Sequence, residues 1–133
     1  MIKIFNEGFT LVELVIIMVV LGILAAVAVP RMGNTIASSE EAAENTIIAS
    51  LRSAVEVYAM DQVVKNSNKS YPDNPFNELD KLPDGYTGIG IPDEDGEWVF
   101  TQENYVAHQR NDNARFKWYY NSSNGEFGDR VAY

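Results

Sequence analysis

The sequence contains no cysteine and a single histidine, His108. Without cysteine there is no disulfide framework, no thiolate metal site and no thiol nucleophile. A lone histidine also excludes any site that is built from several histidines. The chain must therefore be held together by its apolar core, by self-assembly or by a bound metal.

Basic residues are scarce as well. The chain has 10 Lys and Arg against 19 Asp and Glu, which gives a formal net charge of −9. This balance argues against binding to nucleic-acid backbones, which requires clustered lysines and arginines. The 133 residues are enough for one domain with a core, and the sequence shows neither internal repeats nor a second domain.

An apolar run dominates the N-terminal part of the chain. From Phe9 to Val29 the only charged residue is Glu13. As a helix this run is about 30 Å long, the thickness of a bilayer core, so residues 9–30 are predicted to span a membrane. The run is longer than that of an ordinary signal peptide. Residues 24–28 nevertheless imitate a signal-peptidase site, so cleavage after Ala28 stays open as an alternative.

The helical pattern continues beyond Pro30. An apolar face recurs at spacings of three and four over the segment 31–65, which is predicted to be amphipathic. One helix is thus expected from about Phe9 to Val64, with a bend at Pro30, because proline removes a hydrogen bond of the helix. The apolar face consists of Ile47, Leu51, Ala54, Val55 and Tyr58, and all of these except Ala54 are predicted to be buried.

The segment 66–133 reads as a polar connection followed by a sheet of the same globular domain. Turn residues separate short runs of β-forming residues, which favours an antiparallel sheet. The apolar helix face is the natural cover for that sheet, and the fold class is therefore α+β. The predicted strands are 86–91, 97–100, 105–109, 115–121 and 126–133.

A motif at the start of the apolar run resembles the signature of a known protein family. The residues Gly8-Phe9-Thr10-Leu11-Val12-Glu13, continued by Leu14 to Pro30, closely resemble the type IV prepilin signature. Type II secretion pseudopilins and competence filaments carry the same signature. The resemblance implies a pilin-like fold, with a long N-terminal helix packed on a C-terminal antiparallel sheet.

The resemblance also implies how the chain matures. Residues 1–8 would be a leader that a prepilin peptidase cuts after Gly8, and the new N-terminal residue Phe9 would be N-methylated by the same enzyme. The mature subunit would wait in the inner membrane with its C-terminal domain in the periplasm or outside the cell. An inner-membrane assembly platform would then add it to a helical filament on the cell surface or in the periplasm.

Glu13 is the most informative residue of the motif. A carboxylate in a membrane segment costs about 2.5–3.5 kcal/mol, so it usually marks a function and has a partner. The resemblance implies that this partner is the α-amino group of Phe9 on a neighbouring subunit. An alternative from the residues alone is a carboxylate near the helix start that reaches the lipid headgroups.

Other residues suggest weaker interpretations. Gly22 and Pro30 bracket a stretch in which the helix can loosen, which occurs in some assembled filaments of the family; an ordinary kinked membrane helix is the alternative.

Asp93 and Asp95 are weak candidates for calcium ligands, although a solvated turn is favoured and no cofactor is predicted. His108 is expected on a strand or at the surface. Six aromatic side chains are expected to form the core and filament contacts rather than to bind sugar or carry electrons: Trp98, Phe100, Phe116, Trp118, Tyr119 and Tyr120.

The sequence therefore predicts a structural subunit of a type IV pilus-like filament rather than an enzyme. A pseudopilin of a type II secretion system is the alternative, because the motif is shared. A membrane-anchored periplasmic binding module is a remote third reading, since the region after residue 66 offers no polar constellation for it.

Overall fold

The computed structural model describes residues 8–133. The chain divides into two compact units, one that reaches to Ser39 and one from Glu40 to Tyr133, and each is described by itself. The predicted leader falls almost entirely on residues 1–7, which lie outside the described residues. The elements in chain order are α1 (Leu11–Asn66), the 3₁₀ turn η1 (Pro75–Glu78), β1 (Tyr86–Ile89), β2 (Trp98–Phe100), β3 (Tyr105–Gln109), β4 (Arg115–Asn121), β5 (Glu126–Phe127) and β6 (Val131–Ala132).

Helix α1 begins two residues later than predicted, because Thr10 caps it. The hydroxyl oxygen of Thr10 accepts a hydrogen bond from the backbone N–H of Glu13 (3.2 Å). Its carbonyl oxygen accepts one from the N–H of Leu14 (3.1 Å). Thr10 and Glu13 thus stand at the two ends of an S/T-x-x-E sequence, the pattern of a capping box. Pro30 lies within α1, and the helix continues on both sides of it.

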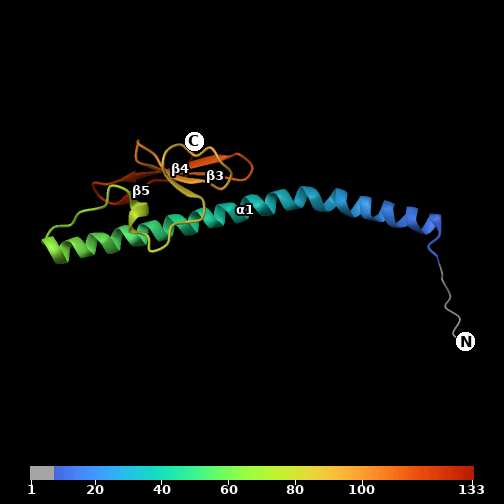
Figure 1. Ribbon diagram of the computed structural model, residues 1–133, viewed down its shortest axis with the longest axis horizontal. Helices are drawn as coiled ribbons and strands as arrows, with labels where there is room; N and C mark the ends of the chain where they lie inside the picture. The colour runs from blue at the N-terminus through green and yellow to red at the C-terminus, as the bar shows by residue number, and fades with distance from the viewer. Residues whose placement is uncertain (1–7) are drawn as a thin grey trace, which may run out of the picture. The chain divides into compact units, whose positions relative to one another are not determined.

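In the second unit, one face of α1 is buried against the sheet, which lies along this part of the helix (Figure 1). The prediction was right for Leu51 and Val55, which are fully buried, but Ile47 and Tyr58 are only half-buried. The centre of the buried face of α1 is displaced by about one residue from the predicted one, so that Ile48 is buried in place of Ile47. The reason is that the stripe also contains a charged residue, which the apolar pattern did not count. The residues buried on α1 are Glu44, Ile48, Leu51, Val55 and Ala59.

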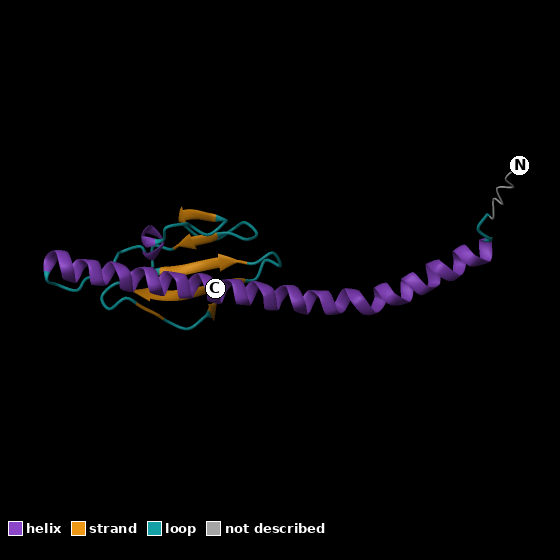
Figure 2. Ribbon diagram, turned by 90° about the horizontal axis from the view of Figure 1, so that it is seen from below, coloured by secondary structure: helices purple, strands orange, loops and turns teal. Residues whose placement is uncertain are grey.

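The sheet has six strands, in the order β1-β2-β3-β4-β5, and β6 also pairs with β4. The prediction of an antiparallel sheet is wrong at one edge, because β1 and β2 run parallel (Figure 2). After β1 the chain returns to the start of that strand, where the N–H of Trp98 donates to the carbonyl of Gly85 (3.0 Å). The carboxylate of Glu97 holds the returning loop by accepting from the hydroxyl of Thr87 and from the N–H of Asp93 (2.7 Å).

The predicted last strand, 126–133, is divided into β5 and β6, and both pair with β4 in antiparallel fashion. Phe127 faces Tyr120, but Val131 faces Lys117, so the edge carries one residue more than the strand opposite. The N–H of Gly128 still donates to the carbonyl of Tyr119 (2.8 Å). The interruption is therefore a local bulge in one edge.

The core of the second unit lies between α1 and the inward face of the sheet. Tyr120 is its largest fully buried side chain. The Tyr120 hydroxyl donates to the carbonyl of Pro72 (2.8 Å), and burial raises the pKa of Tyr120 to about 12. The tyrosine therefore stays a neutral donor that ties the connection after α1 to the core. The buried cluster consists of Ile48, Leu51, Val55, Phe76, Trp98, Phe100, Val106, Trp118 and Tyr120.

Candidate functional site

The N-terminal motif lies at the start of α1 in the first unit. Phe9 precedes the helix and is 79% exposed. Glu13 lies in the first turn of the helix, where the unpaired backbone N–H groups favour a negative charge. Thr10 caps that turn through the backbone of Glu13, so the carboxylate of Glu13 is not needed for the cap. The sequence signal of this cap is the spacing of Thr10 three positions before Glu13, which the prepilin-like motif overlaps.

From Leu14 to Val29, the part of α1 that follows the motif is apolar on all sides. Within residues 8–133, α1 is the helix that is long and apolar enough to cross a membrane, and none of its most apolar window is buried. Large apolar side chains from Leu11 to Val29 are all exposed in the first unit. A helix that is hydrophobic all round requires lipid or other helices around it. The segment is therefore suited to membrane anchoring, as predicted.

Gly22 and Pro30 remain a prediction as points of helix flexibility. A Cβ atom added at Gly22 would meet nothing within 4 Å. Close packing inside the described part of the chain therefore does not require a glycine there. The hypothesis that this stretch can loosen rests on the resemblance to the family and on the low intrinsic helix propensities of glycine and proline.

Comparison with known families identifies this segment. Residues 6–29 match the family described as the prokaryotic N-terminal methylation motif. The chain carries this methylation motif. The match includes Gly8, Phe9 and Glu13 and extends over the apolar run, so it covers the residues on which the resemblance to type IV prepilins was based.

Individual relatives agree with the methylation motif. The chain is 39% identical over 59 residues to the type IV major fimbrial protein FimA of Dichelobacter nodosus, covering 44% of this chain and 38% of FimA. It is 38% identical over 68 residues to the type II secretion system core protein G of Aeromonas hydrophila, covering 50% and 43%. It is 39% identical over 64 residues to the type IV wide pilus major component PilA4 of Thermus thermophilus, covering 48% and 47%. The resemblance to type IV pilins and secretion pseudopilins is therefore confirmed.

The extent of these matches is limited. The chain spans less than half the length of each of these curated relatives. No solved structure is a significant match to the chain. The relatives are named as pilus or secretion components rather than as enzymes. The family match thus identifies residues 6–29, and the second unit must be interpreted from its own residues.

The second unit contains a buried charge on α1 that the apolar pattern of the helix did not include. Glu44 is fully buried, and both of its carboxylate oxygens are bound. Arg110 donates to them from Nε and Nη2 (2.7 Å each). His108 Nδ1 lies 2.9 Å from Oε1, and Arg130 donates to Oε2 (3.2 Å). We call Glu44, His108, Arg110 and Arg130 the buried-charge cluster.

These contacts set the ionisation state of Glu44. Burial by itself would raise the pKa of Glu44, but the hydrogen bonds and charges of Arg110 and His108 lower it to about 2. A carboxylate only accepts hydrogen bonds, so Nδ1 of His108 carries the proton that it shares with Glu44. His108 lies on β3 as expected, but it is buried and stacked on Trp98 (4.3 Å between ring centroids) rather than exposed.

Further contacts surround the buried-charge cluster. Arg130 also donates to Glu41 (2.6 Å), and the side chain and N–H of Asn111 both donate to Glu40 (2.7 and 2.9 Å). The guanidinium groups of Arg110 and Arg130 lie over the ring of Phe116, at 4.1 and 5.3 Å. The acidic residues all come from α1, and their partners come from β3 and the segments after it. The cluster therefore fastens the sheet to the helix, and a carboxylate held ionised in this way is not a proton acceptor for catalysis.

The two weak calcium candidates lie in the loop between β1 and β2. Asp93 contributes its backbone N–H to the carboxylate of Glu97 (2.7 Å), and Asp95 accepts from the side chain of Gln109 (3.3 Å). The hydrogen bonds of Glu97, that from Thr87 first, lower the pKa of this carboxyl. Within the described residues, no group of three or more His, Asp or Glu side chains is arranged to hold a metal. The prediction of no cofactor, with Asp93 and Asp95 as weak calcium candidates, stays untested.

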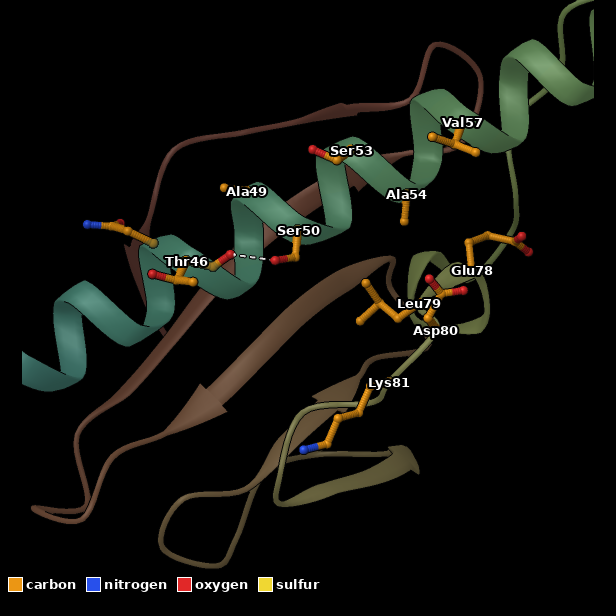
Figure 3. A pocket seen from close by; sticks show the side chains of 11 residues that line it. Thr46, Ala49, Ser50, Ser53, Ala54, Val57, Glu78, Leu79, Asp80 and Lys81 are labelled. Carbon is orange, nitrogen blue, oxygen red and sulfur yellow. Dashed lines mark hydrogen bonds between the residues drawn. The ribbon is translucent and has the colours of Figure 1, made fainter.

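An open groove runs along the other side of α1 in the second unit (Figure 3). Its helix wall consists of short side chains, such as Ala49, Ser53 and Ala54, and its opposite wall is the segment 78–81. The hydroxyl of Ser50 donates to the carbonyl of Thr46 (3.0 Å) and is thereby used within the helix. The lining residues include no histidine, so they do not form a nucleophile–base pair of the serine–histidine type.

The aromatic residues divide between the two faces of the sheet. Trp98, Phe100, Trp118 and Tyr120 point into the core, as predicted. Tyr119, between two of them in sequence, is 45% exposed. The alternation along β4 sends it to the opposite face. The prediction of a core role is thus confirmed for these four, and Phe116 is partly buried against them. The predicted role in filament contacts, which Tyr119 could serve, stays a prediction.

Proposed function

We propose that the chain is a structural subunit of a type IV pilus-like filament, which is cut after Gly8, methylated at Phe9 and assembled through its N-terminal helix. The methylation motif over residues 6–29, continuous with an apolar helix that has no cover in its own unit, carries the proposal. The helix serves as the membrane anchor before assembly, with the second unit in the periplasm. Neighbouring subunits then replace lipid around it in the filament.

Glu13 directs assembly in this proposal. Its carboxylate pairs with the amine of Phe9 on an adjacent subunit, so that neither charge remains alone in a dry bundle of helices. An unpaired charge in such surroundings costs several kcal/mol. The apolar run supports the pairing, because from Phe9 to Val29 it offers Glu13 no other charged side chain as a partner.

Processing is tested by mass spectrometry of the mature N-terminus. The expected product begins with an N-methylated Phe9. A chain that retains Met1, or that begins after Ala28, would contradict the assignment of the cleavage site. A reporter fused after Tyr133 tests the orientation, and activity of that reporter only in the cytoplasm would contradict it.

Assembly is tested by the variants Glu13→Val and Glu13→Gln. Both keep the backbone N–H that Thr10 caps, so the start of the helix is preserved. Both should insert into the membrane and be cut after Gly8, yet give little sheared filament. Glu13→Asp, which keeps the charge but shortens its reach, should give an intermediate yield. Normal filament yield from Glu13→Val with normal processing would disprove charge pairing.

A pseudopilin of a type II secretion system is the second candidate. It is supported by the match to core protein G, which extends over 68 residues and half of this chain. A pseudopilin would build a short periplasmic filament that moves cargo. Neighbouring genes distinguish the two: a secretin with other secretion components indicates the pseudopilin, and retraction machinery indicates the pilus.

A further inference from the structure

The outward face of the sheet in the second unit carries a cluster of tyrosines around one lysine. Lys117 Nζ lies over the rings of Tyr105 and Tyr133, 4.5 and 4.7 Å from their centroids. Tyr119 packs edge-on against Tyr105, with 5.4 Å between ring centroids. Tyr119 and Tyr133 are each 45% exposed. We call these four side chains the tyrosine face.

Lys117 is not satisfied by an acidic partner. Within residues 8–133, the salt bridges found in the second unit do not include it. Its ammonium group is held between two aromatic rings, so it is already positioned and keeps donors for an incoming group. An anionic group bound there would meet a lysine that needs no rearrangement.

A hollow of about 320 Å³ adjoins the tyrosine face. Tyr133 is part of both, and the other polar lining residues are Thr101, Gln102 and Glu103. The hydroxyl oxygen of Thr101 accepts from the N–H of Tyr105 (3.1 Å), and its own proton is left to donate. This volume lies at the lower end of small-molecule sites, and the lining combines an aromatic ring with hydroxyl, amide and carboxylate groups.

The chemistry of this surface favours one class of ligand. Half-exposed tyrosine rings offer flat apolar faces with polar edges, to which the C–H faces of sugar rings can be applied. The hollow supplies donors and acceptors for sugar hydroxyls, and Lys117 supplies one positive charge. A polyanion is disfavoured because the chain has a net charge of −9. A protein partner is disfavoured because a stable complex engages roughly 20–30 residues on each partner, and the tyrosine face has four side chains beside a small hollow.

We propose that the tyrosine face and its hollow bind a short oligosaccharide that carries a single carboxylate. The tyrosine rings stack on the sugar rings, Lys117 binds the carboxylate, and Thr101 and Gln102 bind hydroxyls. The site is distinct from the N-terminal motif, so it holds whether the chain forms a pilus or a secretion filament.

The experiment measures binding of two probes to the full-length chain in detergent micelles, by saturation-transfer NMR and calorimetry. Sialyllactose carries one carboxylate, and lactose is its neutral counterpart. Sialyllactose should bind more tightly than lactose. Tyr119→Ala and Tyr133→Ala should each weaken it by about threefold to tenfold, the range expected for loss of one aromatic contact. Tyr133→Phe, which keeps the ring, should bind as the parent does.

The lysine variants separate charge from packing. Lys117→Met should lower the affinity for sialyllactose to that for lactose, whereas Lys81→Met, at an exposed lysine outside the tyrosine face, should change neither. Near-ultraviolet circular dichroism checks that each variant is folded. The proposal is overturned if neither probe binds, or if the tyrosine variants bind sialyllactose as the parent does. It is also overturned if the tyrosine variants lose filament yield while the parent binds no sugar, since the face is then a contact with a second copy.

Discussion

Replacing Glu44 by glutamine should destabilise the second unit more than any surface charge substitution. The variant keeps the size of the side chain but leaves Arg110 without its carboxylate, and the side chain of Arg110 is only 8% exposed. Breaking a buried ion pair from one side costs about 3–5 kcal/mol. The lowering of the Glu44 pKa from 4.5 to about 2 corresponds to about 3 kcal/mol, in agreement with that range.

The assay is urea unfolding of the full-length chain in detergent micelles, followed by the fluorescence of Trp98 and Trp118. Both tryptophans are buried in the second unit and therefore report on its unfolding. Glu56→Gln is the matched control, because Glu56 pairs with Lys69 at the surface (3.4 Å). That control should cost less than about 1 kcal/mol.

A double variant and the pH dependence test the same reasoning. Glu44→Leu combined with Arg110→Met should recover part of the loss, because the buried guanidinium of Arg110 is removed together with its carboxylate. The partners that remain are Arg130, whose side chain is 28% exposed, and Nδ1 of His108. Because the folded-state pKa of Glu44 is lowered, its stabilisation is complete above about pH 4.5 and is lost as the pH falls toward 2. If Glu44→Gln costs no more than Glu56→Gln, the buried pairing is refuted.

Three further predictions concern the second unit. Leu51→Ala, at a fully buried site, should cost about 2–5 kcal/mol in the same unfolding assay, and an unchanged midpoint would show that this helix face is not packed on the sheet. Gly125→Ala should lower the melting temperature, because Gly125 has a φ of +73° and an added Cβ would collide with the Tyr71 ring; a melting temperature equal to the parent's would contradict the tight turn. Removing divalent cations with EDTA should leave the melting temperature unchanged, because hydrogen bonds from the Thr87 hydroxyl and the Asp93 N–H to Glu97 already hold the loop after β1. A drop in melting temperature would point to a bound metal.

Local features of the sequence were enough for much of the fold. The extent of α1 could be predicted within two residues at each end, because periodicity along one helix needs no knowledge of distant residues. The strands β3 and β4 were predicted with the observed bounds for the same reason. The parallel pairing of β1 with β2 could not be predicted, because it depends on a loop whose return is held by Glu97.

The candidate sites divide in the same way. By itself the sequence determined the N-terminal methylation motif. The motif consists of a glycine, a phenylalanine and a lone glutamate joined to an apolar run, and it is recognised from the spacing of these residues along one short segment. Only the tertiary structure decided the role of Glu44 and His108, which are 64 positions apart and meet at 2.9 Å. It also decided that Tyr119 faces outward beside Lys117. Burial and pairing of a charge depend on which surfaces the fold brings together, and a linear pattern does not contain that information.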